Sequence, residues 1–342
     1  MSDHNDLSDI REVTPVDAEY ERAARLEAAF WEGETQAFGV EALEAKEVDS
    51  VFGRYTNRRF TGDERTPWYA TIHAHGPFQR GLVLGTSGMG QDAHILRTNP
   101  GLHLTFCDIA EESLARWQAT LAAAFPGRVS TMTADLNFVE LTQRTYDVVI
   151  SSSTLHHVIN LEHLAEQINR TLTAGGLFFL QDFVGESMLR FSEEKRRLFE
   201  LLHHRDRLRR NLPDAGLVWR NEDRSLFSPF CGIRSGDILE TMAATLDPVS
   251  VRTCAALVNL ILHTRPADWD GSPLPESLAQ QVERRLRARF PVLRRRTTPS
   301  PFPQAYLEEL LLLDELVCDA GLLKPNNAFG VYRKRDAGAG AT

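Results

Sequence analysis

A glycine-rich segment, Gly81–Gly90 (GLVLGTSGMG), carries the strongest chemical signal in the sequence. It follows a short apolar run and opens a stretch typical of a helix. Its glycines let the backbone turn sharply and approach a ligand closely. In an open parallel sheet, such a loop lies where ligands bind. The alternative is a tight strand-to-helix turn that holds no ligand. The residues expected to touch a ligand are Gly85, Thr86, Ser87, Gly88 and Gly90.

Two aspartates follow the next two predicted strands. Asp108 stands where a carboxylate can accept both ribose hydroxyls of a nucleoside. Asp135, in the segment TADLNF, can accept a hydrogen bond from an exocyclic amine such as that of adenine. Read alone, Asp108 could cap the helix that follows, and Asp135 could be a turn residue. We expect both to contact a nucleoside, together with Ile109 and Leu136.

The run from Ser151 to His157 (SSSTLHH) places hydroxyls and two histidines after the fourth predicted strand. Imidazole can take a proton near neutral pH, so a histidine within hydrogen-bond reach of an acceptor can act as a base. A lone histidine is usually packed or solvated, but two adjacent ones at a strand end are better candidates. We predict His157 as the first catalytic residue and His156 as the second, with Ser151 and Ser152 near the ligand.

Alternating strands and helices must position these groups. Strands are predicted at 81–84, 102–107, 129–133, 146–150 and 177–180, with helices at 92–98, 111–124 and 161–172 between them. This alternation predicts an α/β fold with a mostly parallel sheet and helices on both faces. Helices are also predicted at 16–45, 187–212, 236–246, 277–289 and 304–319, and strands at 249–253 and 329–333, while 257–263 fits either state.

Taken in order, the motifs resemble class I S-adenosylmethionine-dependent methyltransferases, of the type that methylates small molecules in bacteria. The resemblance rests on GLVLGTSGMG, Asp108, TADL, YDVVISSSTLHHV and LTAGGLFFLQDFVG, and covers roughly residues 78–186. More loosely, 329–333 matches the family's antiparallel last strand. The resemblance implies a Rossmann-like sheet and S-adenosyl-L-methionine as the cofactor.

The resemblance also implies roles for the site residues. The loop from Gly85 to Gly90 would hold the methionine portion and the ribose edge, and Asp108 the ribose hydroxyls. Asp135 and Leu136 would frame the adenine, and Ser151 would contribute backbone contacts near the sulfonium. The family usually carries an acid that orients the methionine ammonium two residues before its first loop glycine, where this chain has Val83. Thr86 and Ser87 replace the commoner Cys-Gly.

We therefore expect methyl transfer to a small-molecule acceptor, with a hydroxyl of a secondary metabolite or sugar-like compound as the first expectation. Two alternatives stay open. One is a nicotinamide-dependent oxidoreductase, which the lack of a strict G-x-G-x-x-G disfavours. The other is a non-catalytic protein of the same fold that binds S-adenosylmethionine. Acceptor contacts are predicted for Arg58, Trp68, Tyr69, His73, Asp182 and Phe183, although Trp68 and Tyr69 fit equally well as core aromatics.

Four segments are predicted to organise the chain. Residues 1–77 form an N-terminal helical segment, 78–186 the S-adenosylmethionine-binding core, 187–247 a helical lid or insertion, and 248–342 complete the sheet with helices. The stretch 187–235 follows the fifth strand, so we expect it to cover the acceptor, with the N-terminal helices as the other wall. The alternative is a peripheral bundle that stabilises or dimerises the protein.

Composition narrows the partners. The 342 residues are 42% hydrophobic and 25% charged, which is typical of a globular protein, and the formal charge is −9. A negative surface repels a phosphate backbone, so we expect no nucleic acid partner. The acidic start and the lack of long apolar runs favour a cytoplasmic protein without membrane contact. The four scattered cysteines predict reduced core thiols and no metal site. A homodimer is compatible with the sequence.

Overall fold

Seven strands form the main sheet of the computed structural model, which describes residues 13–14, 17–35, 51–86, 88–269 and 302–336. Their order across the sheet is β3-β2-β1-β4-β5-β9-β7. The strands are β1 (Arg80–Leu84), β2 (His103–Asp108), β3 (Val129–Thr133), β4 (Tyr146–Ser152), β5 (Leu172–Phe183), β7 (Asp247–Cys254) and β9 (Asn327–Arg333). Only β9 runs antiparallel to its neighbours, β5 and β7. The predicted Rossmann-like fold with an antiparallel last strand is confirmed.

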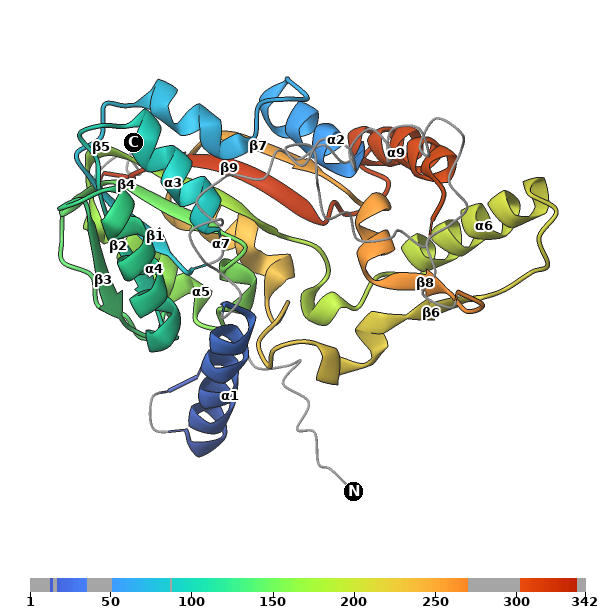
Figure 1. Ribbon diagram of the computed structural model, residues 1–342, viewed down its shortest axis with the longest axis horizontal. Helices are drawn as coiled ribbons and strands as arrows, with labels where there is room; N and C mark the ends of the chain where they lie inside the picture. Colours follow the sequence, from blue (N-terminus) through green and yellow to red (C-terminus); the bar gives the residue numbers. More distant parts are fainter. Residues whose placement is uncertain (1–12, 15–16, 36–50, 87, 270–301, 337–342) are drawn as a thin grey trace, which may run out of the picture.

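Helices cover both faces of the sheet, as Figure 1 shows. The helices α3 (Met89–Thr98) and α4 (Glu111–Ala124) pack on one face, and α5 (Leu161–Thr171) and α7 (Ile238–Thr245) on the other. Alternate residues of β1 divide between the two cores: Val83 joins the first and Leu82 the second. A strand buried on both faces explains the continuous apolar run in the sequence.

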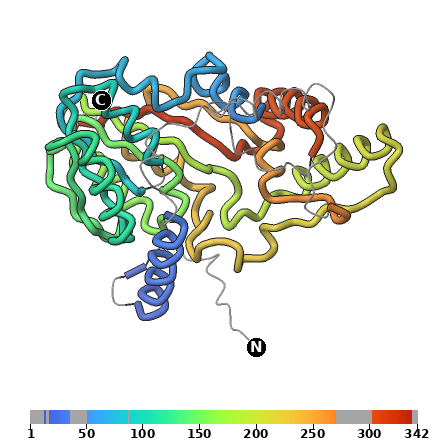
Figure 2. Tube along the Cα trace, viewed as in Figure 1, coloured from blue at the N-terminus to red at the C-terminus, as the bar shows by residue number. Residues whose placement is uncertain are grey.

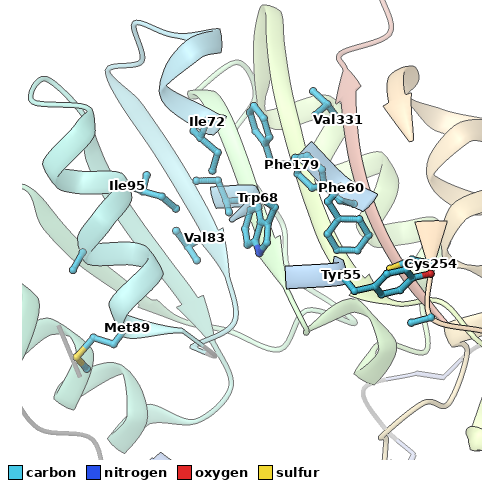
Figure 3. Close-up of a cluster of buried hydrophobic side chains, with 14 of the residues drawn as sticks. Tyr55, Phe60, Trp68, Ile72, Val83, Met89, Ile95, Phe179, Cys254 and Val331 are labelled. Atoms are coloured by element: carbon cyan, nitrogen blue, oxygen red, sulfur yellow. The ribbon is translucent and has the colours of Figure 1, made fainter. Parts of the chain in front are cut away.

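The first core extends beyond the sheet to the N-terminal elements (Figure 3). The helix α2 (Val51–Thr61) contributes Tyr55 and Phe60, and the 3-10 helix η3 (Trp68–His75) contributes Trp68 and Ile72. Trp68 lies against Phe329 of β9, with ring centroids 5.7 Å apart. These segments therefore anchor the region before β1 to the sheet.

A second group of elements lies beside the sheet (Figures 1 and 2). The helix α6 (Glu193–Arg209) packs against α9 (Gln304–Asp319), where Phe199 lies 6.3 Å from Tyr306 between ring centroids. A two-stranded sheet pairs β6 (Leu217–Trp219) with β8 (Thr264–Pro266). The short 3-10 helices are η4 (Leu155–His157), η5 (Ser187–Leu189), η6 (Arg220–Glu222), η7 (Arg224–Leu226), η8 (Ser235–Asp237) and η9 (Val258–Leu262).

The structure refines several predicted boundaries. The N-terminal helix α1 spans Ala18–Thr35, and the rest of the predicted 16–45 lies outside the described residues. The helix predicted from 187 begins only at Glu193, because Ser192 caps it by accepting a hydrogen bond from the backbone N–H of Lys195. The ambiguous 257–263 is a 3-10 turn. The helix predicted at 277–289 lies outside the described residues.

Candidate functional site

A pocket opens at the carboxyl edge of the sheet, where the ends of β1, β2 and β4 meet. Gly85, Thr86, Asp108 and Ile109 form its floor, and Asp135 and Leu136 extend it toward β3. The six were predicted from the sequence as cofactor contacts, and the structure brings them together. The remaining wall comes from elsewhere in the chain: Glu27 and Trp31 of α1, Ser153, Thr154 and His157 after β4, and Phe230.

Gly85 makes the floor possible. Its φ is +84°, which side-chain-bearing residues rarely adopt, and a Cβ at this point would lie 2.2 Å from Oγ1 of Thr154. That hydroxyl in turn donates to the carbonyl of Leu84 at 3.0 Å. The glycine therefore lets the β1 loop touch the β4 loop and leaves the backbone open to the pocket. Gly88 and Gly90 begin α3 and are not pocket-lining, and Ser87 lies outside the described residues.

Asp108 is fixed as an acceptor at the pocket floor. Its carboxylate accepts hydrogen bonds from Oγ1 of Thr86 at 2.7 Å and from the backbone N–H of Ala110 at 2.9 Å. The second bond serves the turn into α4, so the capping and ligand-binding roles considered for this residue are compatible. Burial raises the pKa of Asp108, which the hydrogen bonds partly offset. The backbone N–H groups of Thr86 and Ile109 also donate to this carboxylate, which lines the pocket where a ribose hydroxyl can approach it.

Asp135 is engaged by the N-terminal helix. Its Oδ2 accepts from the phenol of Tyr20 at 2.6 Å, and its Oδ1 accepts from the backbone N–H of Asn137 at 2.9 Å. Tyr20 also stacks on Phe230, with ring centroids 5.5 Å apart. Burial, followed by the charge of Asp135, raises the pKa of Tyr20. The helix α1 thus closes the adenine end of the pocket.

Ser151 and Ser152 were expected near the cofactor, and neither lines the pocket. Both still lie in β4, where Ser151 pairs with Leu84 and Ser152 with Gln181. The chain turns only at Ser153, whose φ is +51°. Ser153 and Thr154 therefore line the pocket in their place.

His157 lines the pocket and is held by a carboxylate. Its Nδ1 lies 2.8 Å from Oε1 of Glu27, and its ring lies edge-on to Trp31 at 5.3 Å between centroids. Because a carboxylate only accepts, Nδ1 carries the hydrogen and Nε2 is the free nitrogen. Burial and the neighbouring His156 lower the pKa of His157. Burial alone would raise the pKa of Glu27, but hydrogen bonds from His157, Phe230 and Trp31 bring it below its usual value.

His156 stands behind His157, at 4.1 Å between ring centroids. Its Nδ1 lies 2.5 Å from Oδ1 of Asp182, a fully buried carboxylate. Backbone N–H groups of Thr154, Leu155 and Phe183 also donate to Asp182. Burial is the largest single influence and would lower the pKa of His156, yet the charge and hydrogen bond of Asp182, with a further hydrogen bond to Cys231, together raise that pKa to about 10. The two histidines therefore have opposite proton preferences.

Six residues were expected to contact the acceptor. Asp182 and Phe183 lie beside His156, the latter at 6.2 Å between ring centroids. None of the six lines the pocket, and the other four lie farther from it. Arg58 pairs with Glu315 of α9, and His73 is exposed with Nδ1 2.7 Å from the carbonyl of Ala70. Trp68 is buried in the core, and Tyr69 packs edge-on to His94. Trp68 and Tyr69 are therefore packing residues, which is the alternative considered for them.

Sequence reasoning missed Glu27, Trp31 and Phe230. Glu27 is a buried carboxylate on a helix that carries many other charged residues. It accepts hydrogen bonds from the side chains of Trp31 and Ser228 and from the backbone N–H of Phe230. An acid and a tryptophan four residues apart share a helix face, which is the signal that could have marked them.

Comparison with known proteins gives one match to a family model. Residues 85–178 match the model of a methyltransferase domain. No curated protein matches the sequence. Among the helices that the structure describes, none has the length and apolar character that a membrane span requires.

Solved structures of similar shape include several named proteins. A putative sarcosine dimethylglycine methyltransferase from Galdieria sulphuraria is 15% identical at a TM-score of 0.45, covering 92% of this chain and 99% of its own. Coclaurine N-methyltransferase, bound to N-methylheliamine and S-adenosylhomocysteine, is 12% identical at 0.46, covering 94% and 89%. The [4+2]-cyclase SpnF is 13% identical at 0.43, covering 82% and 86%.

The family match runs from the loop after β1 into β5, and the strand-end residues of the pocket lie inside it. The glycine that opens the floor, the buried acid after β2 and the acid after β3 are the groups that a nucleoside with a charged tail requires, so the residues fit S-adenosylmethionine. Residues 85–178 therefore carry a methyltransferase domain, and the Rossmann-like fold and the pocket around them fit S-adenosylmethionine as the cofactor.

Proposed function

We propose that the enzyme methylates a hydroxyl oxygen of a small molecule, a secondary metabolite or sugar-like compound. The observation that carries this proposal is His157 on the pocket wall, with Nδ1 held by Glu27 and Nε2 left for the acceptor. A hydroxyl must lose its proton as its oxygen is methylated, whereas a neutral amine need not. A buried, oriented imidazole suits the hydroxyl.

The roles of the residues follow from the geometry. Asp108 would hold the ribose hydroxyls, Gly85 and Thr86 the amino-acid portion, and Asp135 and Leu136 the adenine edge. The cofactor supplies an electrophilic methyl group. His157 takes the acceptor proton on Nε2, and Glu27 stabilises the imidazolium that forms. His156, oriented by Asp182, stands behind His157 and helps to fix the loop that carries it.

The surrounding segments belong to the same proposal. The segment 187–235 reaches the pocket through Phe230, while its helix α6 packs on α9. The segment around Phe230 would cover the acceptor, whereas α6 would only support the fold outside the pocket. We further propose that the enzyme works in the cytoplasm, on small molecules and not on nucleic acid, with a homodimer as one assembly.

Product analysis tests the proposal. The full chain would be incubated with methyl-labelled S-adenosylmethionine and a panel of phenols, alcohols, sugars and amines, and the labelled atom identified by mass spectrometry and NMR. We expect labelled ethers, and His157→Ala should lower turnover by about 10²–10⁴-fold with cofactor affinity nearly unchanged. Labelled amines alone, or unchanged turnover of a hydroxyl in His157→Ala, would contradict the proposal.

A further inference from the structure

A cluster that the sequence alone does not predict contains the imidazoles of His156 and His157 and the thiol of Cys231. One potential ligand atom from each lies within 4.8 Å of the other two. The backbone brings Cys231 there, because the N–H of Ile233 donates to the carbonyl of His156 at 3.1 Å. Cys231 is a half-buried free thiol. The expectation of no metal site was based on the sequence spacing of cysteines, which says nothing about two adjacent histidines brought next to a distant thiol.

The surroundings of both imidazoles favour metal binding. Asp182 accepts from Nδ1 of His156, and Glu27 from Nδ1 of His157. Each Nε2 is therefore the ring nitrogen that no carboxylate holds, and the imidazole of His156 already forms a hydrogen bond with Cys231, the third member of the cluster. In metalloproteins a ligating histidine almost always donates its other N–H to a carboxylate or carbonyl, which fixes the ring and makes the ligand more basic. A single histidine that acts as an acid–base catalyst would need one such carboxylate. Here each of the two histidine rings has its own.

The local charge also favours a cation. The Asp182 side chain is fully buried and that of Glu27 is 5% exposed, so two negative charges lie beside the cluster with little screening by water. Arg224 opposes a cation, since its guanidinium donates to the carbonyl of Cys231 at 2.9 Å. The two carboxylates, Asp182 and Glu27, nevertheless outweigh the single positive charge of Arg224. A divalent ion with one thiolate and two neutral imidazoles keeps a single net positive charge, which the carboxylates balance.

We propose that His156, His157 and Cys231 bind a zinc ion at the edge of the cofactor pocket, with a fourth position open toward the acceptor. Nitrogen and sulfur ligands select a borderline-soft cation, and three protein ligands with one open position are typical of catalytic zinc. His157 faces the pocket directly, so an ion on its Nε2 lies beside the space for the acceptor.

The role of the ion rests on the proposed function. An acceptor hydroxyl bound at the open position loses its proton to water, because the ion stabilises the oxyanion. The oxygen–methyl bond then forms as the methyl–sulfur bond breaks, and the sulfur keeps the electron pair. In the metal-bound enzyme His157 is a ligand, and the ion replaces it as the group that activates the hydroxyl.

Cobalt substitution tests the site without measuring turnover. The full chain, free of any affinity tag, would be stripped with a chelator and titrated with Co²⁺. We expect one ion per chain and a thiolate-to-cobalt charge-transfer absorption. Cys231→Ser should lose that absorption and bind at least about tenfold more weakly. Cys318→Ser, a half-buried thiol on α9, is the matched control and should keep both. Melting temperatures show that the variants are folded.

The outcomes separate the ion from the proposed function. A wild-type chain without the charge-transfer absorption, or Cys231→Ser with it, overturns the site. Full-rate hydroxyl methylation by the stripped chain overturns the catalytic role of the ion and leaves the proposed function standing. If no hydroxyl is methylated with or without zinc, the proposed function fails, while the cobalt spectrum still decides whether the ion binds.

Discussion

Oε1 of Glu27 lies 2.8 Å from Nδ1 of His157, so the N-terminal helix completes the site that the strand ends begin. Glu27 also fixes the loop after η7 by accepting from Oγ of Ser228 and from the backbone N–H of Phe230. One carboxylate therefore joins three segments that are distant in sequence. Docking of α1, orientation of the imidazole and closure of the pocket depend on the same side chain.

Glu27→Gln should lower turnover by about 10–100-fold, because a neutral amide orients His157 less well and does not stabilise its charged or metal-bound form. The free energy of unfolding should fall by about 1–3 kcal/mol through the lost charge-assisted hydrogen bonds. Turnover, S-adenosylhomocysteine affinity and urea unfolding would be measured on the same preparation.

Glu34→Gln is the control for that change, since Glu34 is an exposed carboxylate on the same helix. It should leave both quantities within experimental error. Equal losses in the two variants would mean that the charge of α1, and not the contact with His157, is responsible.

The strand-end residues could be predicted because their signals are local. Gly85, Asp108 and Asp135 each follow an apolar strand, and parallel strands bring their carboxyl ends to one edge. Ser153 and Thr154, and not Ser151 and Ser152, line the pocket, because pairing with β5 extends β4 through Ser152. A strand's end depends on its partner, which the segment's own residues do not reveal.

The rest of the site depends on tertiary packing. The apolar periodicity of α1 does not separate Glu27 from Glu21 or Glu34, and only its spacing of four residues from Trp31 sets it apart. Arg58 was expected near the acceptor, yet its nearest strong partner is Glu315 on α9. Cys231 meets His156 only after the chain has passed through α6 and β6.

Asp108→Ala should weaken S-adenosylhomocysteine binding by about 1–3 kcal/mol, through loss of a charge-assisted hydrogen bond to the ribose. Asp108→Asn keeps one oxygen, which can accept from Thr86 or from Ala110 but not from both, and it should lose less than Asp108→Ala. Isothermal calorimetry at matched pH measures both. Asp223→Ala is a control, because this exposed residue also accepts from a backbone N–H two positions on, but outside the pocket. Unchanged affinity in Asp108→Ala would remove this carboxylate from the cofactor site.

Gly85→Ala should abolish cofactor binding. A methyl group at 2.2 Å from Oγ1 of Thr154 must push the β1 and β4 loops apart, in addition to the cost of a positive φ. Gly127→Ala separates the two effects, since its φ of +72° is similar but nothing lies within 4 Å of the added carbon. The control should lose about 1–2 kcal/mol of stability and bind S-adenosylhomocysteine normally. If Gly85→Ala also binds normally, the close approach of these loops is not required.

Asp92 makes stability depend on pH. This α3 residue is buried, it accepts a hydrogen bond from Nε1 of Trp117 at 3.0 Å, and burial raises its pKa from 3.8 to about 7. Below the unfolded value the carboxyl is protonated in both states and burial costs little. As pH rises toward the folded value, the unfolded chain releases its proton first, and stability falls until about pH 7. Asp92→Asn resembles the neutral acid and escapes this loss. Urea unfolding should therefore show wild type losing stability relative to Asp92→Asn between pH 5 and pH 8, by on the order of 2–4 kcal/mol. Parallel curves for the two proteins would show that Asp92 does not titrate in this range.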